Sequence, residues 1–135
     1  MGDIDAQLAG MRELANDGNR LEGIEFTLER NLDLYDIPTK PIGDGTQDSG
    51  TYMEFWGSFD GAGHTIRGIN VEEDTWDHAG LFGVFRGDYL KNLTVEGKVT
   101  GQVRVGGIAA QLEGTSIENC VNRCEVTSLK AATSY

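Results

Sequence analysis

The spacing of apolar residues along this chain changes once, early in the sequence. Leu8, Met11 and Ala15 recur at the three- and four-residue intervals of one helix face. This pattern predicts an amphipathic helix over residues 5–16. After residue 20, apolar and polar residues alternate in short runs separated by glycines, which is typical of half-buried strands.

The strand-like part of the chain contains an internal repeat. Residues 80–101 align without a gap with residues 107–128, and residues 66–71 resemble residues 90–95. A repeat of this length is the signature of stacked supersecondary units. Residues 80–101 and 107–128 are identical at five pairs of positions: Gly80/Gly107, Gly87/Gly114, Asn92/Asn119, Val99/Val126 and Thr100/Thr127.

The repeat lacks a helical period, which argues against leucine-rich repeats. The sequence therefore predicts an all-β solenoid, namely a right-handed parallel β-helix with an N-terminal α-helical cap. We expect Leu93 to stack on Cys120, Val99 on Val126, and Asn92 on Asn119 at a shared bend. The residues expected to point inward are Leu93, Val95 and Val99 in one coil and Cys120, Asn122, Cys124 and Val126 in the next.

The predicted organisation has four segments. They are a capping helix (1–20), a first coil and loop (21–58), the repeat coils (59–128) and a tail (129–135). Within the second segment, prolines and glycines predict a loop over residues 38–52. A stack of coils ends in unpaired backbone groups, so an uncapped last coil predicts that the tail is a truncation point in a longer polypeptide. The uncapped coil also permits end-to-end self-association. The alternative is that the tail folds over the last coil as a loop cap.

Composition narrows the range of partners. The formal net charge is −11, which disfavours nucleic acid and anionic membrane surfaces. No run of 18 apolar residues exists, so no membrane insertion is expected. The N-terminus lacks the basic and apolar regions of a signal peptide, which leaves a cytoplasmic protein or a trimmed piece of a secreted one. We favour the secreted piece.

Several linked motifs carry a family resemblance. Residues 59–71, which read FDGAGHTIRGINV, resemble a segment of bacterial parallel β-helix proteins, and AGLFG at 79–83 with NLTV at 92–95 resembles the GLUG repeat. VGGIA at 105–109 and IENC at 117–120 resemble its next copy. Lead-in motifs of the same family are similar to NLDL at 31–34 and PIG at 41–43.

The resemblance implies a secreted or cell-surface bacterial protein. GLUG-like repeats occur in adhesin-like proteins and beside the catalytic part of immunoglobulin-degrading metallopeptidases. Two departures, Ala109-Ala110 and Arg123-Cys124, replace glycine-containing pairs and leave the coil geometry there less defined. The resemblance carries no catalytic residue onto this chain.

No residue pattern predicts a catalytic, cofactor-binding or metal-binding site. His64 and His78 lack the His-Glu-x-x-His spacing of zinc proteases, and we expect His64 to hold a turn. Residues 44–48 lack the glycine and glutamate of an EF-hand, so loop 44–50 is a poor calcium site. The carboxylates weighed as possible catalytic groups are Asp60, Glu72, Glu73, Asp74, Asp77 and Asp88.

Loop 72–78 is the best candidate for a sugar-binding cleft. Its carboxylates flank Trp76, which could serve as a platform for a sugar ring, although a solvated charged loop is the favoured reading. Asp60 precedes Gly61, and we expect its side chain to set a turn. Cys120 and Cys124 are too far apart along one strand for a disulfide, so two free, buried thiols are predicted.

The predicted β-helix is compatible with three functions. The leading one is a non-catalytic repeat module that acts as a rigid spacer and presents a surface for a glycan or a host protein. The alternative is a fragment of a carbohydrate-active enzyme, a polysaccharide lyase or glycosidase built on a β-helix. Ice binding is the weakest, because only Thr100 and Thr127 repeat among the outward positions.

Overall fold

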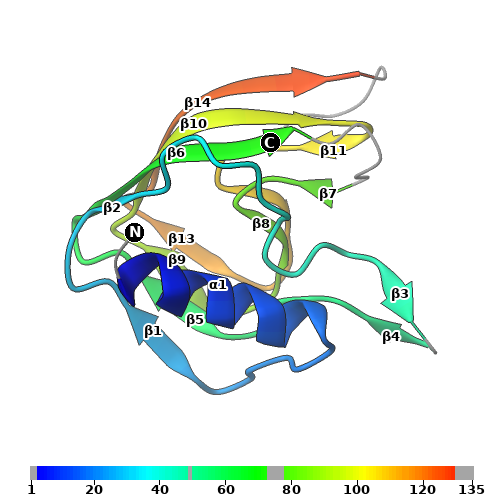
Figure 1. The fold of residues 1–135 in the computed structure, drawn as a ribbon. Helices are drawn as coiled ribbons and strands as arrows, with labels where there is room; N and C mark the ends of the chain where they lie inside the picture. Colours follow the sequence, from blue (N-terminus) through cyan, green and yellow to red (C-terminus); the bar gives the residue numbers. More distant parts are fainter. Residues whose placement is uncertain (1–2, 49, 73–77, 130–135) are drawn as a thin grey trace.

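The computed structural model describes residues 3–48, 50–72 and 78–129 (Figure 1). Within these residues the helix α1 (Asp3–Asn16) precedes a long series of short strands. The predicted helix is confirmed, because Leu8, Met11 and Ala15 are all buried in the core. Figure 1 shows α1 lying across the end of the strand stack that is formed by β1 and β2.

The strands form parallel sheets. The first contains β1 (Glu25–Thr27), β5 (Ser58–Asp60), β9 (Tyr89–Lys91) and β13 (Ser116–Glu118), in that order. The second contains β2 (Leu32–Asp33), β6 (Thr65–Glu72), β10 (Thr94–Gly101) and β14 (Val121–Ser128), again in sequence order. Smaller parallel pairs join β7 (His78–Ala79) to β11 (Arg104–Val105) and β8 (Phe82–Phe85) to β12 (Ala109–Leu112).

The repeat determines the register between β10 and β14. The two strands pair without a shift from Thr94 opposite Val121 to Gly101 opposite Ser128. Val99 lies opposite Val126, as the repeat predicted. Since one slipped residue would turn every side chain to the other face, this register keeps the apolar column continuous.

A bulge between β6 and β10 depends on a glycine. The register of the two strands shifts between Val95 and Gly97, and Gly97 has a φ of 144°. A Cβ atom at this position would overlap the Ile69 carbonyl oxygen. Gly97 therefore allows the two backbones to approach each other where one strand has an extra residue.

The core fills the space between the sheets. Leu93, Val95 and Val99 are almost fully buried, which confirms their predicted inward direction. Near β8, the rings of Phe55 and Phe82 pack with their centroids 5.2 Å apart. Aromatic packing of this kind contributes beyond the burial of area alone.

Two predictions of local structure need correction. The region predicted as a loop, residues 38–52, contains the antiparallel hairpin of β3 (Gln47–Asp48) and β4 (Thr51–Tyr52). Pro38 and Ile42 in the same region form single parallel bridges to Asn70 and Phe82. The inward side chains predicted at residues 120–126 are also less buried than expected, because β14 lies at the edge of its sheet. Cys120, Cys124 and Val126 are half-buried and Asn122 is exposed.

Candidate functional site

The outer face of the second sheet carries charges of alternating sign. Asp33, Arg67, Glu96 and Arg123 lie on β2, β6, β10 and β14, one on each strand. Asp33 forms an ion pair with Arg67 at 2.9 Å, and Glu96 lies 4.0 Å from Arg123. Opposite charges on neighbouring strands stabilise a sheet modestly when they are exposed.

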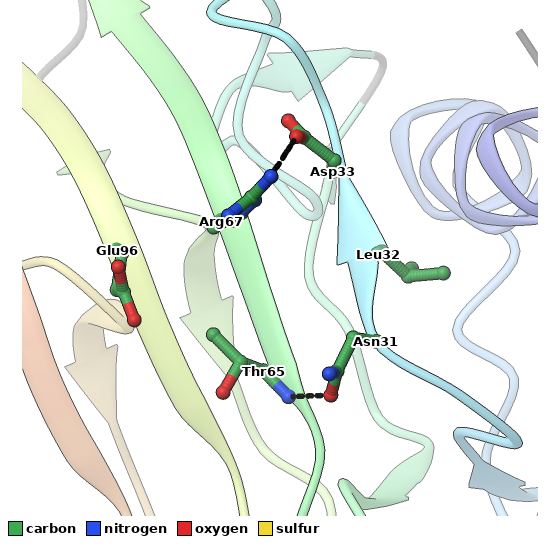
Figure 2. Close-up of a pocket in the computed structure, with 6 residues that line it drawn as sticks. All are labelled: Asn31, Leu32, Asp33, Thr65, Arg67 and Glu96. Carbon is green, nitrogen blue, oxygen red and sulfur yellow. Dashed lines mark hydrogen bonds and ion pairs between the residues drawn. The ribbon is translucent and has the colours of Figure 1, made fainter.

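A hollow of about 460 Å³ opens on this face (Figure 2). Figure 2 shows Arg67 reaching Asp33, while Leu32 points toward α1. The Asn31 side-chain oxygen accepts a hydrogen bond from the Thr65 backbone N–H at 2.9 Å. The hollow is lined by Asn31, Leu32, Asp33, Thr65, Arg67 and Glu96.

The hollow is lined by charged groups and by hydrogen-bonded polar groups. A hydrogen bond from the Tyr35 backbone N–H, together with Arg67, lowers the pKa of Asp33. Arg67 is 65% exposed, so its guanidinium is accessible to a ligand although it already contacts Asp33. The lining residues include no histidine or cysteine that could act as a nucleophile or a general base near neutral pH.

A second polar cluster centres on Arg86. The Arg86 guanidinium bonds Glu54 at 3.0 Å and Glu113 at 2.6 Å. Trp56 donates its indole N–H to Glu54 at 3.3 Å and packs against the guanidinium groups of Arg20 and Arg86. Both carboxylates are engaged by one cation, so the arrangement ties together four separate segments of chain.

Sequence reasoning missed this cluster for a physical reason. Its charged members come from residues 20, 54, 86 and 113, which share no local spacing, and only their strand pairing brings them together. Phe55 lies opposite Phe85 in a parallel bridge, which sets Trp56 beside Arg86 and leaves Glu54 on the same side of the strand, diagonally across from Arg86. No local pattern in the sequence therefore indicated the cluster.

His64 lies in the predicted turn, and His78 lies apart from it. The backbone N–H of His64 donates to the Gly61 carbonyl at 2.8 Å, so this residue closes the predicted turn through its main chain. His78 lies elsewhere, with its Nε2 3.0 Å from the Gln111 side-chain oxygen. No group of three or more potential metal ligands is found among the described residues.

The predicted turn at Asp60 is confirmed. Its carboxylate accepts the Ala62 backbone N–H at 2.8 Å and the Asn92 side-chain amide at 3.3 Å, and these bonds lower its pKa. Of the other carboxylates considered, Glu72 ends β6, and Asp88 is an exposed bend residue. The hydrogen bond from Tyr89 to Glu25, together with the charges of Asp60 and Asp88, raises the pKa of Tyr89. Glu73, Asp74, Trp76 and Asp77 lie outside the described residues.

Asp44 serves as a local anchor within loop 44–50. Its carboxylate accepts both the backbone N–H and the hydroxyl of Thr46, at 3.0 and 2.7 Å. Its own N–H donates to the Asn16 side chain at the end of α1. Asp44 therefore joins the hairpin to the helix, and the side chain of Asp48 lies outside the described part of the loop.

The predicted asparagine stack is confirmed. Asn92 and Asn119 have φ values of 54° and 52°, in the left-handed region that asparagine tolerates. The Asn119 side-chain amide donates to the Asn92 side-chain oxygen at 3.2 Å. Their neighbour Asp60 extends this chain of hydrogen bonds to three successive bends.

The two cysteines are free thiols, as predicted. The Cys120 thiol donates to the Leu90 carbonyl at 3.3 Å, and the Cys124 thiol donates to the Val95 carbonyl at 3.5 Å. Partial burial raises the pKa of both thiols, that of Cys124 to about 11. Such thiols remain protonated and react slowly near neutral pH.

More than half of the chain is similar to part of a known protein. The chain is 37% identical over 78 residues, 56% of its length, to Halomucin of Haloquadratum walsbyi. It spans about 1% of the length of that protein. No family model matches the chain, and no solved structure matches it. Among the described residues, no helix is long and apolar enough to cross a membrane.

Proposed function

We propose that this chain is a right-handed parallel β-helix that serves as a rigid, non-catalytic display module of a secreted or cell-surface protein. The observation that carries this proposal is the identical strand order of the two main sheets, each paired parallel throughout. A right-handed winding follows from the general preference of parallel crossovers. The GLUG resemblance of residues 79–128 is part of the same proposal.

The surface location draws support from the comparison. The name Halomucin marks the matched protein as mucin-like, and a mucin-like parent suits the surface location that we propose for this chain. The acidic composition agrees with this location, because a high net charge favours solubility. The parallel pairing supplies stiffness, because each long strand is hydrogen-bonded to the strand of the next pass along most of its length.

The display surface is the charged face around the hollow, and its ligand is a glycan. Arg67 supplies exposed donors, and Asn31, Asp33 and Glu96 supply acceptors, a combination that suits hydroxyl-rich ligands. The test is a glycan array probed with the wild type, Arg67→Glu and Arg30→Glu. Arg30 is an exposed residue outside the hollow, so it controls for the change of net charge.

We expect Arg67→Glu to lose the glycan signal and Arg30→Glu to keep it. Equal loss in both variants, or no binding by the wild type, would contradict the proposed display surface. The enzyme alternative is tested in parallel by incubation with uronic-acid polymers. Cleavage that copurifies with the protein and disappears in Glu113→Gln would replace a display role with catalysis at the Arg86 cluster.

A further inference from the structure

Among the described residues, the apolar interior is less covered at β13 and β14 than in the earlier passes. Cys120 and Val126 continue the columns of Leu93 and Val99, which are almost fully buried, but they are themselves only half-buried. β13 and β14 each come last in the strand order of their sheets, and no further strand among the described residues pairs with them. Four large apolar side chains near this end are 39–53% exposed: Leu112, Ile117, Val121 and Leu129.

The free edge of β14 has a defined hydrogen-bonding pattern. The backbone N–H groups of Val121 and Leu129 donate to Leu93 and Gly101 on the β10 side. Because alternate residues of a strand direct their polar groups to the same side, the odd-numbered residues of β14 face β10. The N–H and C=O groups of Asn122, Cys124 and Val126 therefore face outward and can accept another strand.

The outward side chains of β14 select one partner and one register. Antiparallel pairing with a second copy about an axis at Cys124 places Arg123 opposite Glu125 of that copy, and the two-fold axis repeats this contact. An axis at Arg123 or Glu125 would instead bring like charges together. Val121 then lies opposite Thr127, and Asn122 lies opposite Val126.

We propose that β14 pairs antiparallel with β14 of a second copy of this chain, about a two-fold axis at Cys124. The interface is isologous, so each favourable contact occurs twice. The Asn122 side-chain oxygen accepts the Cys124 N–H at 2.9 Å in the single chain. Pairing exchanges this local bond in each copy for one backbone bond from the Cys124 N–H to the other copy, and it covers the apolar interior at this end.

The thiols provide a direct test of the register. At the axis, the two Cys124 residues form a hydrogen-bonded pair with Cα atoms about 5.5 Å apart, within the range of disulfides. Diamide at pH 9 oxidises the two thiols by accepting two electrons and two protons, which leaves an S–S bond. We expect a covalent dimer with the wild type and Cys120→Ser, and none with Cys124→Ser, because Cys120 lies opposite Ser128.

Charge variants test the same contact without covalent chemistry. Sedimentation velocity over a range of concentrations should show reversible doubling of the 14.7 kDa mass. Arg123→Glu turns two attractive contacts repulsive, so the dissociation constant should rise about tenfold or more. The double variant Arg123→Glu/Glu125→Arg restores opposite charges and should recover most of the affinity, while Arg30→Glu should leave it unchanged.

Circular dichroism on each variant verifies that the fold is intact. A folded wild type that remains a monomer at every concentration overturns the proposal. A dimer that forms disulfides equally through Cys120, or that ignores both charge variants, would place the contact on another surface. A dimer weakened by Arg123→Glu and rescued by the double variant supports β14 pairing.

Discussion

Val99 and Val126 offer a matched pair of perturbations at one position of the repeat. They occupy the same column, lie opposite each other on β10 and β14, and differ in burial, because Val99 is fully buried and Val126 is half-buried. Replacing each by alanine removes the same atoms. Any difference in stability therefore reports the position of the residue in the stack.

The structure sets the magnitudes. Val99→Ala loses about 1.6 kcal/mol of transfer free energy, at about 0.8 kcal/mol for each of two carbon groups. The enclosed void adds about 1 kcal/mol, so the free energy of unfolding should fall by about 2.5 kcal/mol. Val126→Ala leaves no enclosed void and removes a side chain that already contacts water. The free energy of unfolding should therefore fall by only about 1 kcal/mol.

Urea denaturation followed by circular dichroism measures the difference. With a slope of about 2 kcal/mol per molar, the two midpoints should differ by about 0.7 M. The measurement requires protein dilute enough to be monomeric, because dimerisation through β14 would cover Val126. Equal losses, or a larger loss for Val126→Ala, would refute the assignment of β14 to an open edge.

Three further predictions follow from individual contacts. Gly97→Ala should lower the free energy of unfolding in urea by about 3 kcal/mol, because of backbone strain and overlap with the neighbouring strand. Gly114 has a φ of 63° but open space around it, so Gly114→Ala should cost about 1 kcal/mol. Comparable losses for the two variants would refute the close approach of the strands at Gly97. Folding lowers the pKa of Asp60, so its stabilising effect is present above the unfolded pKa of about 3.9 and is lost as the pH falls through the folded pKa. The difference in free energy of unfolding between the wild type and Asp60→Asn should therefore narrow below about pH 4. A difference that stays constant with pH contradicts this. Iodoacetamide at pH 8 should label Cys124 about 100-fold more slowly in the native protein than in urea, since its thiolate is scarce, and similar rates would show that this thiol is not shielded.

The sequence predicted the features shared by residues 80–101 and 107–128. The resemblance of residues 66–71 to residues 90–95 gave a wrong register, because Ile66 lies opposite Val95 and Val71 lies opposite Val99. Val99 and Val126 recur at the same place in the repeat, and this spacing gave the register of β10 with β14. Asn92 and Asn119 recur likewise and stack at the predicted bend. The helix was predictable because its apolar residues follow a single period.

Features that depend on how separate passes lie against each other were not predictable. The Arg86 cluster joins Glu54 and Glu113, which have no relation in sequence spacing. The partial exposure of Cys124 was missed because alternation specifies direction and says nothing about whether a further strand covers it. Loop 38–52 was interpreted from its glycines and prolines, which do not reveal single bridges such as that of Ile42 with Phe82.

The central claim is that successive passes of the chain run parallel and in register. Pairs of spin labels at Thr94/Val121 and at Thr100/Thr127 test it, with both cysteines replaced by serine and labelled protein diluted in unlabelled protein. Parallel pairing predicts strong dipolar broadening for both pairs and little for the crossed pair Thr94/Thr127, about 20 Å apart at ~3.3 Å per residue. Broadening in the crossed pair alone would show antiparallel neighbours and contradict the account.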